Sequence, residues 1–84
     1  MGTLSHLPNV GKVLENNLIQ VGIKTPEQLR EIGAEDTFIR IRKCVDQGAC
    51  LHMLYGIQGA IEGVPYRFLE DSTKQKLKKF FKTL

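Results

Sequence analysis

The side chains best suited to metal binding in this 84-residue chain are two thiols and an imidazole, Cys44, Cys50 and His52. Thiolates and imidazoles are common zinc ligands, but this spacing matches none of the usual zinc patterns. A disulfide framework in so short a secreted chain usually needs about four or more cysteines, and this chain has 2. We therefore predict two small buried cysteines, a histidine at the surface or its boundary, and no bound metal or other cofactor.

The sequence shows none of the residue combinations that common catalytic sites require. The sequence has no Ser-His-Asp combination, no paired carboxylates in an apolar context and no phosphate loop of the G-x-x-x-x-G-K type. Gly56 and Gly59 fall inside an apolar stretch with helical character, where small residues would let another helix approach closely. We interpret them as packing residues and predict a protein without enzymatic activity.

Positive charge is concentrated at the end of the chain. The net charge is +3, from 12 basic and 9 acidic residues. Residues 1–48 carry six of each sign, whereas residues 64–84 carry six basic and two acidic side chains. Lys74, Lys78 and Lys82 would form one row on a helix, at spacings of four. This row is a candidate nucleic-acid patch, and the alternative is an ordinary solvated helix face.

Hydrophobic periodicity divides the chain into helices, and no segment shows a convincing run of strand alternation. Hydrophobic residues make up 42% of the chain, which is enough for the core of one small domain. We predict a single all-α domain over residues 1–84, with residues 1–6 flexible. Its five helices are expected at residues 10–21, 26–32, 34–47, 49–62 and from residue 71 or 72 to about 83.

Several helix ends and faces carry local signals. Thr25 can cap the second helix, with Pro26 at its first position and Gln28 completing a capping box. Gly22 follows the first helix as a left-handed C-terminal cap would. The stretch at 49–62 is apolar on most sides, so we expect it at the centre of the core. The inward face of the first helix is predicted to consist of Val10, Val13, Leu14, Leu18 and Val21.

The segment Leu7-Pro8-Asn9-Val10-Gly11 resembles the hairpin of a helix-hairpin-helix motif, whose pattern is apolar-x-Gly-x-Gly. Asn9 replaces the first glycine, and asparagine tolerates a positive φ better than most residues. The resemblance implies a helix-hairpin-helix-like (SAM-like) N-terminal half in which the hairpin contacts a DNA phosphate. The candidate contacts are Asn9, Val10, Gly11 and Lys12, and the alternative is a tight turn that only packs the first helix.

Two longer segments resemble the C-terminal domain of the TfoX (Sxy) family. Residues 22–34 are similar to its pattern GI-x-T-x-x-x-L-x-x-x-GA, and residues 54–63 to its pattern LYAL-x-GA-x-x-G. Tyr66 and Leu69 then follow at the positions of an aromatic residue and a leucine in that family. The resemblance covers residues 7 to 80. It implies a bacterial regulator of competence and DNA-uptake genes that acts with a transcription regulator, and whose full-length members carry a preceding α/β domain.

Two functions remain open at this stage. The first is weak, phosphate-directed DNA binding through the hairpin and the lysine row. The second is protein interaction or homodimerisation with no nucleic-acid contact, anchored by exposed apolar groups such as Met53, Tyr66 or Phe68. Partners on this view include a transcription regulator or a separate protein similar to the N-terminal TfoX domain. Since no segment reads as a signal peptide or membrane span, we expect a soluble, cytoplasmic protein.

Overall fold

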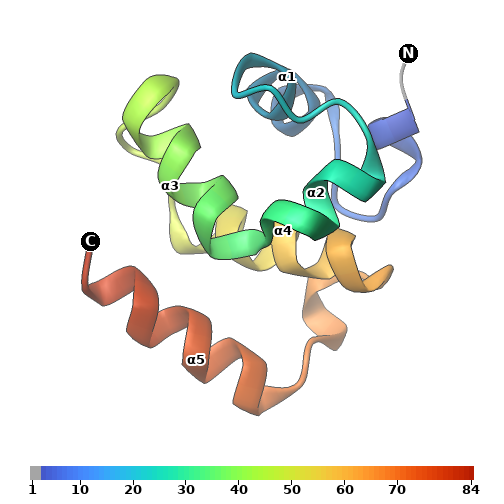
Figure 1. Cartoon of the computed structure of the whole chain (residues 1–84). Coiled ribbons are helices and arrows are strands. Elements are labelled where there is room, and N and C mark those ends of the chain that lie inside the picture. Colours follow the sequence, from blue (N-terminus) through green and yellow to red (C-terminus); the bar gives the residue numbers. More distant parts are fainter. Residues whose placement is uncertain (1–2) are drawn as a thin grey trace.

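The computed structural model shows a domain built of helices joined by short connections. The model describes residues 3–84, and this part of the chain contains five α-helices, two short 3-10 helices and no strand (Figure 1). The all-α prediction with five helices is confirmed. In chain order the elements are η1 (Thr3–His6), α1 (Lys12–Gln20), α2 (Pro26–Ile32), α3 (Ala34–Cys44), α4 (Leu51–Glu62), η2 (Tyr66–Phe68) and α5 (Asp71–Lys82).

The capping box of α2 forms with one variation. The Gln28 backbone N–H donates to Thr25 Oγ1 over 3.1 Å, as predicted. The Gln28 side chain reaches back to the Lys24 N–H, at 2.7 Å, and not to that of Thr25. Two N–H groups near the helix start are thereby satisfied. Gly22 has a φ of +86°, which confirms the left-handed residue after α1.

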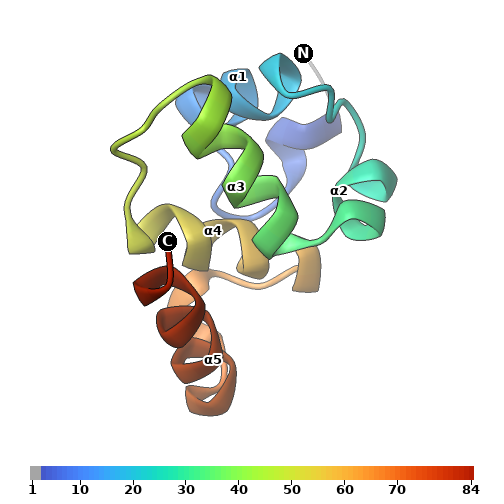
Figure 2. The ribbon, with the colours of Figure 1, turned by 60° about the vertical axis from the view of Figure 1, so that its left-hand side comes forward.

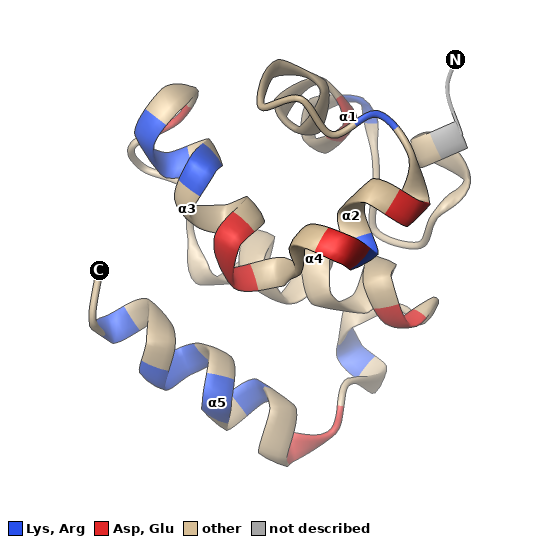
Figure 3. Ribbon diagram, in the orientation of Figure 1, with Lys and Arg blue, Asp and Glu red and all other residues tan. Residues whose placement is uncertain are grey.

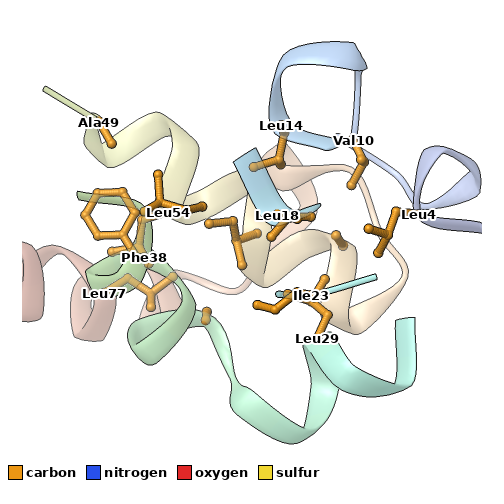
Figure 4. Close-up of a cluster of buried hydrophobic side chains, with 14 residues drawn as sticks. Leu4, Val10, Leu14, Leu18, Ile23, Leu29, Phe38, Ala49, Leu54 and Leu77 are labelled. Carbon is orange, nitrogen blue, oxygen red and sulfur yellow. The ribbon is translucent and has the colours of Figure 1, made fainter. Parts of the chain in front are cut away.

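Helix α4 lies at the centre of the domain, as its apolar composition predicts. It packs against α2, α3, α5 and η2 (Figures 1 and 2). Leu54, Ile57 and Ala60 of α4 are fully buried, and they meet Phe38 and Leu18 in one cluster (Figure 4). The core therefore forms around one helix that is covered on most of its sides.

The start of α1 differs from the prediction. The helix begins at Lys12, because residues 7–10 form a turn in which the Val10 N–H donates to Leu7 O. Leu14 and Leu18 face the core, but Val13 is 72% exposed. The predicted inward position of Val13 is wrong because successive helical residues differ by about 100° in direction, and Leu14 occupies the inward direction.

Two other expectations about burial also need correction. Cys44 and Cys50 are both exposed free thiols, because they border the loop between α3 and α4. Leu4, inside the segment expected to be flexible, is only 1% exposed and belongs to the core. Residues 1–2 of that segment lie outside the described residues. No described helix combines the length and apolarity needed to cross a membrane.

Helix α5 is amphipathic and packs at one edge of the domain. Leu77 is buried, and the Phe81 ring lies 5.9 Å from that of Phe38 on α3. The Arg42 guanidinium sits 5.4 Å from the Phe81 ring centroid and donates to Ala49 O, so this arginine ties α3 to its neighbours. Lysines recur along this helix (Figure 3), and Lys76, Lys78, Lys79 and Lys82 are exposed.

Candidate functional site

The segment before α1, residues 7–10, forms a tight turn that contains one residue of positive φ. Asn9 has a φ of +70° and is the only described non-glycine residue with a positive φ. It follows Pro8 in the turn closed by the Val10 N–H and Leu7 O, the arrangement of a type II turn. This positive φ agrees with the tolerance of asparagine for the left-handed region.

The Asn9 side chain points into the domain and joins three segments. Its Nδ2 donates to Gly56 O over 3.2 Å and to Val64 O over 3.0 Å. Its Oδ1 accepts from the Tyr66 N–H at 3.0 Å. Both amide hydrogens and the carbonyl oxygen of this side chain are thus used within the protein. Asn9 therefore fixes the hairpin to α4 and to the segment leading into η2.

The glycines of α4 make room for this asparagine. A Cβ atom placed on Gly59 would lie 2.5 Å from Asn9 Nδ2 and 2.7 Å from Val64 O, whereas one on Gly56 would meet Asn9 Cβ at 3.6 Å. The packing role predicted for these glycines is confirmed. What approaches them is the Asn9 side chain and, at Gly59, the 64–66 segment, and not another helix.

These segments and the start of α1 border an open groove of about 440 Å³. We call it the α1–α4 groove. It is lined by Asn9, Gly11, Lys12, Val13, Leu14, His52, Met53, Gly56 and Tyr66. Three of the four hairpin candidates for phosphate contact therefore share one site with two candidates for partner contact. Val10, the fourth, is 7% exposed and belongs to the core.

The walls of the α1–α4 groove are mainly apolar. Val13 is 72% exposed, Tyr66 is 39% exposed and Met53 is half-buried. The His52 ring packs edge-on against Tyr66, with 4.8 Å between the ring centroids. Lys12 is the one Lys, Arg, Asp or Glu side chain that the described part of the chain contributes to the lining. Exposed aliphatic and aromatic groups next to flexible methionine are typical of protein-binding surfaces.

Phe68 and the α5 lysines lie outside this groove. Phe68 is 65% exposed, with the Arg67 guanidinium 5.1 Å from its ring centroid. Lys78 and Lys82 are exposed on α5, and Lys74 is partly buried. Helices α1 and α5 occupy opposite ends of the domain in both ribbon views (Figures 1 and 2). The fold thus separates the hairpin from the lysine row.

Val13, Leu14, Gly56 and His52 line the groove but were not predicted as site residues. Gly56 and Leu14 carried only packing signals, and Val13 matched the spacing of the buried stripe. Val13 could have been identified as an exposed residue if the turn at residues 7–10 had been recognised and the helix had been predicted to begin at Lys12. His52 can be recognised as a groove residue only in the folded chain, where its ring contacts that of Tyr66.

Comparison with known proteins connects this architecture to a family. A family model described as the TfoX C-terminal domain matches residues 1–81. The chain is 33% identical over 79 residues to the DNA transformation protein TfoX of Haemophilus influenzae, covering 94% of this chain and 36% of that protein. It is 30% identical over 74 residues to the DNA transformation protein TfoX1 of Aliivibrio fischeri, covering 88% of this chain and 35% of that protein. The chain thus spans about a third of the length of these curated relatives.

Solved structures agree with this assignment. An uncharacterized protein from Listeria monocytogenes, in a triclinic crystal form, superimposes with a TM-score of 0.92 at 44% identity, covering 95% of this chain and 90% of that one. A protein of unknown function from the same organism, in a tetragonal form, gives a TM-score of 0.92 at 43% identity, covering 96% and 98%. With the family match over nearly its whole length, this chain belongs to the TfoX C-terminal domain family.

Proposed function

We propose that this domain is a non-enzymatic docking module in the regulation of DNA transformation, and that it binds a protein partner in the α1–α4 groove. The names of the relatives connect the domain to DNA transformation. The observation that carries the docking role is the convergence of exposed Val13, half-buried Met53 and Tyr66 on one groove. Such a convergence supplies the apolar anchor site that protein interfaces require.

The chemistry of the hairpin favours protein over DNA at this site. Phosphate recognition depends on several cationic contacts, and Lys12 is the only Lys or Arg that the described residues contribute to the lining. The Asn9 side chain uses both of its amide hydrogens within the domain and so offers no donor to a phosphate. What remains exposed on this face is chiefly apolar, which favours burial against another protein surface.

A pair of variants on one helix tests the docking role in the host that encodes this chain. Val13 and Ile19 are both exposed on α1, at 72% and 44%, but only Val13 lines the groove. We expect Val13→Glu to lower transformation frequency nearly to the level of a gene deletion, because a carboxylate cannot be buried cheaply against an apolar partner. Ile19→Glu should leave the frequency near that of the unaltered protein.

Immunoblotting for equal protein abundance and circular dichroism of the purified variants serve as controls for folding. The proposal would be rejected if Val13→Glu, at normal abundance, transformed as well as the unaltered protein. Equal loss of transformation in both variants would also count against it, because the effect would then not depend on the groove.

A second candidate function is weak DNA binding along α5, away from the groove. The observation that favours it is the exposed pair Lys78 and Lys82 on a helix whose first turn holds its only acidic residue, Asp71. Binding through these lysines would be independent of DNA sequence, because lysines that contact only phosphates do not read base edges.

A salt series separates this candidate from the hairpin. Anisotropy of a labelled DNA duplex should report affinity that falls as salt rises, and each lysine removed should reduce the slope of log K against log salt by about 1. We expect this reduction in Lys78→Ala and Lys82→Ala, and no change in Lys12→Ala. Absence of binding at low salt, or an effect confined to Lys12→Ala, would exclude α5 as the DNA site.

A further inference from the structure

The first turns of two helices, α1 and α4, both contribute residues to the α1–α4 groove. Residues 11–14 at the start of α1 and residues 52–53 at the start of α4 belong to the lining. The N-cap residues Gly11 and Cys50 make no side-chain cap hydrogen bond. The N-terminal end of a helix carries a partial positive charge, which an acidic cap would reduce. Here the apolar walls lie beside two helix starts that have no side-chain cap, and α4 has no acidic residue in its first turn.

The side chains around the groove reinforce this asymmetry. Among residues 3–84, Lys12 is its only lining residue with a Lys, Arg, Asp or Glu side chain, and no carboxylate of this part of the chain lines it. Glu15, the acidic residue in the first turn of α1, has its Oε2 atom buried and is not part of the lining. The charge that complements an apolar surface with such a border is negative.

We infer that the occupant of the α1–α4 groove is an acidic amphipathic helix of a protein partner, an inference that rests on the proposed docking function. Residues 3–84 contain no strand, so this part of the chain has no sheet edge to which a partner strand could be added. Helix-in-groove recognition suits a groove between helices and uses apolar anchors at spacings of three and four. The anchors would contact Val13, Met53 and Tyr66, and the acidic residues would face Lys12 and the start of α1.

The test uses three synthetic helical peptides and the complete chain. The first carries two leucines spaced i, i+4 and flanked by glutamates, the second has lysines in place of those glutamates, and the third has alanines in place of the leucines. Titrations followed by ¹⁵N–¹H NMR give the dissociation constant and identify the residues that respond. We expect the acidic leucine peptide to bind at low salt roughly fivefold or more tightly than the lysine peptide. The alanine peptide should not perturb the groove residues.

Charge reversal within the protein provides the matched control. Lys12→Glu should remove the preference for the acidic peptide, whereas Lys79→Glu, the same change at an exposed position on α5, should preserve it. If the acidic and lysine peptides bind the groove equally, the inference about charge is wrong and docking in the groove stands. If neither leucine peptide perturbs the groove, the helical occupant is excluded. The proposed function is then judged separately by the Val13→Glu and Ile19→Glu comparison in cells.

Discussion

Gly59→Ala is expected to remove most of the stability of the domain and to leave a substantial fraction of it unfolded at room temperature. The new Cβ would lie 2.5 Å from Asn9 Nδ2 and 2.7 Å from the backbone oxygen of Val64, distances that real Cβ contacts do not show. Relief requires moving the Asn9 side chain and the 64–66 segment, which breaks their hydrogen bonds. We expect a loss of about 3 kcal/mol or more, from overpacking together with unsatisfied polar groups. A domain this small has a total stability of about 3–5 kcal/mol.

Gly56→Ala is the matched control, because Gly56 lies on the same helix and faces the same asparagine. Its added Cβ would meet Asn9 Cβ at 3.6 Å, an ordinary van der Waals contact. Alanine is also a better helix former than glycine by about 1 kcal/mol. We therefore expect Gly56→Ala to be neutral or slightly stabilising in urea unfolding followed by circular dichroism. Similar unfolding midpoints for the two variants would show that the close approach at Gly59 has little energetic effect.

Asn9→Ala is expected to destabilise the domain by about 2–4 kcal/mol. The substitution removes three hydrogen bonds and leaves Gly56 O, Val64 O and the Tyr66 N–H without this partner. It also places alanine at a φ of +70°, which costs about 1–2 kcal/mol for residues with a Cβ. Because the Tyr66 N–H would lose its acceptor, amide hydrogen exchange at Tyr66 should accelerate more than exchange in the centre of α4.

Asn9→Gly separates the two contributions. Glycine accepts the positive φ without strain but cannot make the side-chain hydrogen bonds, so its unfolding free energy should lie between those of Asn9→Ala and the unaltered protein. Asn9→Asp tests how much the Nδ2 donor of Asn9 stabilises the fold, because the substitution would place a carboxylate oxygen against the Gly56 and Val64 carbonyls. We expect it to be as destabilising as Asn9→Ala at neutral pH. If Asn9→Asp were as stable as the unaltered protein, the Nδ2 donor bonds would not stabilise the fold.

The proposed docking site shares residues with the contacts that stabilise the fold. Asn9 and Gly56 line the α1–α4 groove, and the Asn9 Oδ1 bond to the Tyr66 N–H holds the segment that supplies its aromatic wall. Loss of this bond should therefore widen or distort the groove before the helices separate. For this reason variants at Val13, which makes no such bond, are better tests of docking than variants at Asn9.

The sequence alone predicted the features that depend on neighbouring residues. Helix number, the cap at Thr25 and Gln28, the left-handed Gly22 and the positive φ of Asn9 all result from local backbone and side-chain chemistry. The central place of α4 was also predictable, because a helix apolar on most sides must be covered on most sides. Family membership was predicted from the sequence patterns of residues 22–34 and 54–63. The first of these segments also contains Gly22 and the cap formed by Thr25 and Gln28.

Only the tertiary structure decided what the side chains meet. The exposure of Val13 depends on the residue at which α1 begins, and the exposure of both cysteines depends on the loop at the ends of α3 and α4. Asn9 reaches Gly56, Val64 and Tyr66 across 47 to 57 residues of chain, contacts that no local pattern specifies. Three of the hairpin candidates and two of the apolar candidates thus came together in one groove, while Phe68 and the lysine row of α5 lie apart from it. Burial and long-range hydrogen bonds are properties of the packed chain, and local propensity does not contain them.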